Sequence, residues 1–72
     1  MAGKIKKMID TIIAKRSRGI SELAYTTKTK LLIKGIDPEA YDENSEDNPL
    51  IIKRVKQFAK ELGIDINNES EN

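Results

Sequence analysis

The sequence predicts an all-α fold, a small single-domain bundle of three main helices over about 4–18, 21–34 and 48–62, with a short helical turn near 38–41. Two observations lead to this expectation. In three segments the apolar residues recur at steps of three and four, which is the spacing of one face of a helix. Each of these segments ends at a glycine that is followed by isoleucine and a short oxygen-bearing residue.

The glycines mark where the predicted helices stop. Glycine adopts the left-handed backbone conformation that closes a helix, and the isoleucine after it can pack back onto the last turn. The serine or aspartate that follows can cap the next helix by accepting hydrogen bonds from its first amides. The three triplets are Gly19-Ile20-Ser21, Gly35-Ile36-Asp37 and Gly63-Ile64-Asp65.

The first two predicted helices are joined by a very short connection, so we expect them to pack as antiparallel neighbours, with Ser21 capping the second. The run 26–30 is rich in threonine, which is a poor helix former. A break into two short helices there is an alternative, and so is a strand over 29–34, although a lone strand has nothing to pair with. The residues expected to face the core are Ile5, Met8, Ile9, Ile12 and Ile13 in the first helix, and Ile20, Leu23, Ala24, Thr27 and Leu31 in the second.

The segment 36–48 carries six carboxylates and no cation. Asp37 followed by Pro38 is typical of a cap and the first residue of a helical turn, and Tyr41 is expected to fix the remaining loop to the core. The last helix has the clearest amphipathic pattern. Its stripe is Ile51, Val55, Phe58, Ala59 and Leu62. The domain is expected to cover 1–66, with a disordered tail at 67–72 because these residues include no apolar side chain.

The composition argues against an enzyme or a metal protein. The 72 residues include no cysteine and no histidine. This removes the commonest general base and the commonest metal ligands. An EF-hand loop starting at Asp42 would need glycine and glutamate where the chain has Asp47 and Lys53. No glycine-rich phosphate loop occurs. We therefore expect no catalytic residue, no metal site, no cofactor and no small-molecule substrate.

The net charge of +1 conceals an uneven distribution. Residues 1–35 hold nine cations and two acids, whereas residues 36–72 hold four cations and ten acids. The two halves can complement each other within the fold or between two copies, or the basic half can bind a charged partner. Lysine and arginine suit phosphate contacts. The candidates for nucleic-acid or anion binding are Lys4, Lys7, Arg16, Arg18, Lys28, Lys30 and Lys34.

These features favour a non-enzymatic protein-interaction or regulatory domain that binds another protein or itself, with nucleic-acid binding through the basic face of the first two helices as the alternative. The candidate protein-interface residues are Leu32, Ile33, Leu50 and Ile52, which either form an exposed apolar patch or widen the core. No apolar run approaches the roughly 20 residues that span a bilayer, and no secretory signal is recognised. A cytoplasmic location is therefore expected. A first helix lying on an anionic membrane is disfavoured because the core needs its apolar stripe.

Overall fold

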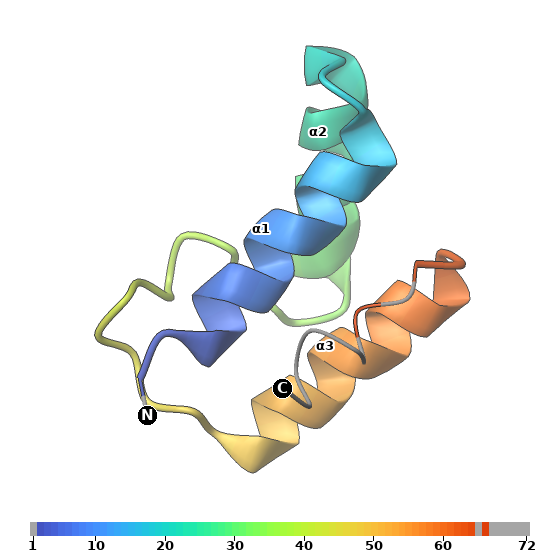
Figure 1. The fold of residues 1–72 in the computed structure, drawn as a ribbon. Helices are drawn as coiled ribbons and strands as arrows, with labels where there is room; N and C mark the ends of the chain where they lie inside the picture. The colour runs from blue at the N-terminus through green and yellow to red at the C-terminus, as the bar shows by residue number, and fades with distance from the viewer. Residues whose placement is uncertain (1, 65, 67–72) are drawn as a thin grey trace.

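The computed structural model describes residues 2–64 and 66, and these residues form three helices and no strand (Figure 1). The helices are α1 (Lys4–Ser17), α2 (Ser21–Ile33) and α3 (Pro49–Glu61). Each helix end lies within one residue of its predicted position, so the all-α prediction is confirmed. The predicted tail at 67–72 lies outside the described residues.

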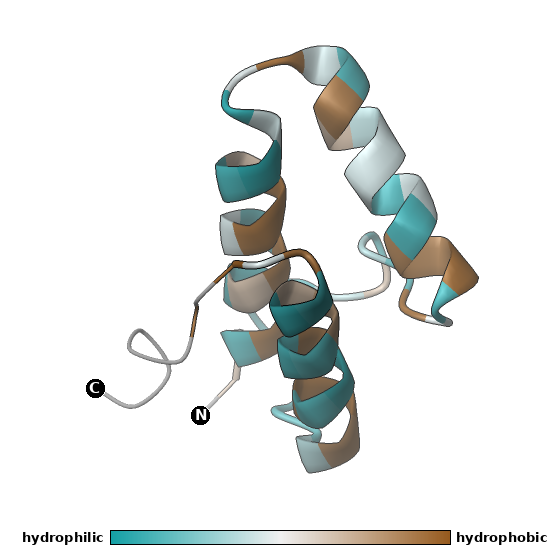
Figure 2. Ribbon diagram, turned by 90° about the vertical axis from the view of Figure 1, so that its right-hand side faces the viewer, coloured by the Kyte–Doolittle hydropathy of each residue, from teal (hydrophilic) through white to brown (hydrophobic). Residues whose placement is uncertain are grey.

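The central helix is α1, because both α2 and α3 pack against it while contacting each other far less. Figure 2 shows α1 and α2 diverging from the turn that joins them. An ion pair of 3.1 Å between Lys34 Nζ and Glu61 Oε1 links the end of α2 to the end of α3. The core between the helices is almost entirely aliphatic. It consists of Ile5, Met8, Ile9, Ile12, Leu31, Ile36, Val55, Phe58, Ala59 and Ile66.

The predicted glycine stops are present at the ends of α2 and α3. Gly35 and Gly63 have positive φ angles of 82° and 75°. After Gly35, the Ile36 N–H donates to the Leu31 carbonyl at 2.9 Å, which turns the Ile36 side chain back into the core. This is the hydrogen-bond pattern of a Schellman motif, and it repeats after Gly63. At these two positions the glycine ends the helix and the following isoleucine packs against the same core.

The turn between α1 and α2 differs from this pattern. Both Arg18 and Gly19 have positive φ angles, 50° and 84°, so the chain reverses within two residues. Ile20 is left 50% exposed instead of packing back as predicted. The prediction that Ser21 caps α2 is also wrong. Ile20 occupies the N-cap position and no side chain caps the helix, because the tight turn places Ser21 already inside the first turn.

The threonine-rich run of α2 is continuous helix, as predicted, and neither of the two alternatives, a break or a strand, is present. The hydroxyls of Thr26, Thr27 and Thr29 donate to the carbonyls four residues earlier at 2.8, 2.7 and 3.0 Å. These bonds satisfy the hydroxyls locally. Only Thr27 and Leu31 of α2 are buried, and Leu23 is 40% exposed although its spacing placed it in the core stripe. The reason is that α1 is the only helix that packs closely on α2.

The predicted turn near 38–41 is present as one hydrogen-bonded turn rather than a length of helix. Asp37 closes it through two bonds, because its carbonyl accepts from the Ala40 N–H at 3.1 Å and its side chain accepts from the Glu39 N–H at 2.9 Å. Tyr41 is half-buried and packs against the core, as expected. It therefore fixes to the helices the start of segment 42–48, which we call the acidic loop.

The N-terminus of α1 takes its cap from the acidic loop. Gly3, which precedes the helix, has no side chain to supply one and has a φ of 87°. The Lys4 N–H instead donates to Asp47 Oδ1 at 3.0 Å, and the Gly3 N–H donates to the Ser45 carbonyl at 2.9 Å. Carboxylates favour the positive end of a helix dipole. The acidic loop thus supplies hydrogen-bond acceptors to the start of the basic first helix within one fold.

Replacing Asp47 with alanine is expected to lower the free energy of unfolding by about 1 kcal/mol, because the first amide of α1 loses its acceptor. Asp47→Asn keeps an acceptor oxygen and should lose less. Glu46→Ala is the matched control, since it removes the same charge one residue earlier from an exposed side chain. Urea unfolding followed by circular dichroism measures all three. Equal losses for Asp47→Ala and Glu46→Ala would show that general charge, not the cap, is responsible.

Candidate functional site

The side of α2 that points away from α1 is apolar and uncovered. Tyr25, Leu32 and Ile33 are 74%, 54% and 78% exposed. A helix advances about 100° per residue, so Tyr25 and Leu32 lie nearly in line, two turns apart, with Thr29 between them. We call Tyr25, Thr29, Leu32 and Ile33 the outer face of α2. In Figure 2 the end of α2 that carries Leu32 and Ile33 is coloured as hydrophobic.

The four predicted interface residues do not form one patch. Leu32 and Ile33 belong to the outer face of α2, whereas Leu50 and Ile52 lie in the first turn of α3. The ion pair at Glu61 places the end of α2 beside the end of α3, about 16 Å along the helix from Leu50. Leu50 is 72% exposed, while Ile52 is half-buried against the core. For Ile52, therefore, the alternative of a wider core holds in part.

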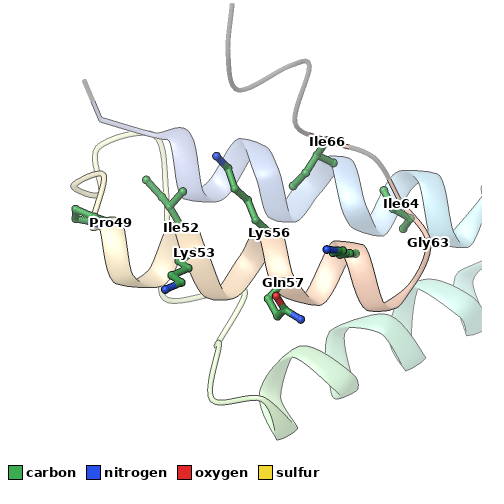
Figure 3. A pocket seen from close by; sticks show the side chains of 9 residues that line it. Pro49, Ile52, Lys53, Lys56, Gln57, Gly63, Ile64 and Ile66 are labelled. Atoms are coloured by element: carbon green, nitrogen blue, oxygen red, sulfur yellow. The ribbon is translucent and has the colours of Figure 1, made fainter.

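A groove that the sequence did not reveal runs along α3. It has a volume of about 730 Å³. We call this site the α3 groove; it is lined by Pro49, Ile52, Lys53, Lys56, Gln57, Lys60, Gly63, Ile64 and Ile66. Figure 3 shows that Ile64 and Ile66 come from the segment after α3, which folds back beside the helix. This fold-back follows from the glycine stop at the end of α3, so the apolar lining comes from two separate segments.

Three lysines of the α3 groove recur at i, i+3 and i+7, the spacing of one helix face. Lys53, Lys56 and Lys60 make no ion pair within the part of the chain that the structure describes. This spacing of lysines is visible in the sequence, but it is equally typical of the solvent-exposed face of a helix. What makes it a candidate site is the apolar lining beside it.

The seven cations considered for nucleic-acid binding do not gather on one face. Arg16 and Arg18 lie at the turn that joins α1 and α2, while Lys28 and Lys30 are exposed on α2. Lys34 pairs with a carboxylate at the end of α3. Lys4 and Lys7 lie at the opposite end of α1 from the two arginines, beside the acidic loop. Asp47 therefore lies beside Lys4, and Glu61 is paired with Lys34.

Lys6 illustrates how α1 neutralises part of its own charge. Its Nζ lies 2.6 Å from Asp10 Oδ2, one helical turn later. The hydrogen bond and the charge of Asp10 raise the pKa of Lys6 above its ordinary value of 10.5, and Glu43 and Asp42 add smaller contributions of the same sign. The ammonium group of Lys6 is therefore turned toward carboxylates of its own chain.

Within residues 2–64 and 66 there is no group of three or more acidic, histidine or cysteine side chains that could hold a metal ion. No helix in the same residues has the length and apolar character needed to cross a membrane. The fold is thus a small three-helix all-α domain with an uncovered helix face and a cationic groove. Comparison with protein-family models, with curated proteins and with solved structures finds no match to this chain.

Proposed function

We propose that this chain is a small non-enzymatic domain that binds another protein through the outer face of α2. The observation that supports the proposal most is that α2 has apolar side chains on two sides and only one side covered. A group of large apolar side chains that stays exposed on the second side of a helix is typical of an interaction surface. In this chain Leu31 faces the core, while Tyr25, Leu32 and Ile33 face outward.

The composition of the outer face fits a protein contact. One tyrosine and two branched aliphatic residues lie within about two helical turns, and aromatic residues are enriched at the centres of interfaces. Covering each of these side chains could contribute about 1.5–3 kcal/mol before the entropic cost of association. Thr29 lies between them and is short enough to let a partner approach closely.

Affinity capture from a native lysate tests the proposal with two matched variants. Ile33→Asp places a charge on the outer face, and Leu50→Asp makes the same kind of change on α3. Both side chains are more than 70% exposed, so both variants should fold. We expect a captured protein to be lost at least tenfold with Ile33→Asp and retained with Leu50→Asp. Equal capture by both variants contradicts a role for α2.

The same purified chain can be its own partner, and sedimentation at increasing concentration decides this case. An association that Ile33→Asp removes and Leu50→Asp leaves intact would make a second copy the occupant of the outer face. The nucleic-acid alternative is separated by a salt series with DNA and RNA, because phosphate contacts weaken steeply as salt rises. Tight binding that falls with salt and is unaffected by Ile33→Asp would favour that alternative.

A further inference from the structure

We propose that the α3 groove is a second binding site, separate from the outer face of α2, and that it takes an acidic amphipathic helical segment of a partner protein. The inference starts from the shape of the groove. It extends along most of α3, which is about 20 Å long for 13 residues. Because it is open along its length, it suits an extended occupant such as a peptide helix more than an enclosed small ligand.

The lining of the groove indicates which side of such a helix would meet it. Ile52 contributes from α3, and Ile64 and Ile66 contribute from the segment after α3 (Figure 3). Aliphatic side chains at i, i+3, i+4 and i+7 of a partner helix can pack on such a surface. The groove contains no aromatic ring among these residues, so it provides no platform on which nucleobases could stack.

The charge of the groove indicates the sign of the partner. Lys53, Lys56 and Lys60 lie along it, and none forms an ion pair with another described residue. By contrast, Lys34 at the end of α2 is paired with Glu61. Three cations that have no ion pair among the described residues, beside an apolar surface, create a positive potential that attracts and orients carboxylates. Glutamates flanking the apolar face of a partner helix would complement them.

A designed peptide of about 14 residues tests the proposal, with leucine on one helical face and glutamate on the rest. Fluorescence anisotropy of the labelled peptide measures its affinity for the full chain. The groove variant is Lys53→Gln with Lys60→Gln, and the matched variant is Lys28→Gln with Lys30→Gln on α2. All four lysines are exposed, so both variants should fold. We expect the groove variant to weaken binding about tenfold and the α2 variant by less than twofold.

Two control peptides test separately whether binding needs a continuous apolar face and whether it needs negative charge. A peptide of identical composition with its leucines scattered should bind at least tenfold more weakly, because it has no continuous apolar face. A peptide with lysine in place of glutamate should not bind measurably. Equal binding by either control overturns the proposal, as does the absence of binding by the acidic amphipathic peptide at millimolar concentration.

The same assay separates this site from the proposed function of α2. Ile33→Asp should leave the affinity of the peptide unchanged. If Ile33→Asp abolishes peptide binding and the groove variant does not, the groove is not the site while the outer face of α2 still binds protein. A dimer in sedimentation that the groove variant dissociates would make a second copy the occupant, and would also overturn the proposal.

Discussion

Replacing Ile12 with aspartate is expected to unfold the chain. Ile12 lies in the central helix and is fully buried among the aliphatic residues of the core. The change removes roughly 1.5–3 kcal/mol of apolar burial and places a carboxylate among aliphatic side chains, at a cost of several kcal/mol more. A domain of this size has a total stability of about 4–11 kcal/mol. The expected loss is therefore comparable to the total free energy of unfolding.

Circular dichroism at 222 nm and urea unfolding measure this effect. Ile33→Asp is the matched control, because the same substitution at a side chain that is 78% exposed should leave the helical signal intact. Ile12→Ala should lower the free energy of unfolding by about 2–5 kcal/mol without introducing a charge. A cooperative, fully helical Ile12→Asp protein would contradict the arrangement of the core around α1.

The sequence predicted the three helices accurately because their signals are local. Apolar spacing sets each helix, and the positive φ that a glycine permits sets the ends of α2 and α3. The same spacing misplaced Leu23, because whether a stripe is buried depends on what covers it. Only α1 packs closely on α2, and the two helices diverge (Figure 2). A helical period indicates which residues share a face but not which faces find a partner within the chain.

Of the two candidate surfaces, the outer face of α2 could be predicted in part from the sequence, because its signal is also local. Leu32 and Ile33 were recognised as excess apolar residues, and they are exposed. The α3 groove was not recognised, because it requires Ile64 and Ile66 to fold back beside α3. The cap that Asp47 supplies to α1 joins residues 43 positions apart. Contacts over such separations leave no periodic pattern in the sequence.

Replacing Gly3 with alanine is expected to destabilise the chain strongly at a site outside the core. Gly3 has a φ of 87°, in the left-handed region that side chains disfavour, and a Cβ at this position would lie 2.8 Å from the backbone oxygen of Glu43. The strained conformation and the overlap with a backbone atom together should cost about 2–3 kcal/mol. The overlap cannot be relieved by a flexible side chain, so the acidic loop would have to move away from α1. That movement would also weaken the bond from the Gly3 N–H to Ser45.

Gly19→Ala is the matched control for this prediction. Gly19 has nearly the same φ, 84°, but a Cβ there would meet no atom within 4 Å. Only the conformational cost of about 1 kcal/mol should then apply. Urea unfolding measures the free energy of unfolding of both variants. Gly3→Ala should be about 1–2 kcal/mol less stable than Gly19→Ala, and this difference is the cost of the overlap with the acidic loop. If Gly3→Ala and Gly19→Ala lower the free energy of unfolding equally, the loop does not press against the start of α1 in solution, and the Asp47 cap on α1 would be in doubt with it.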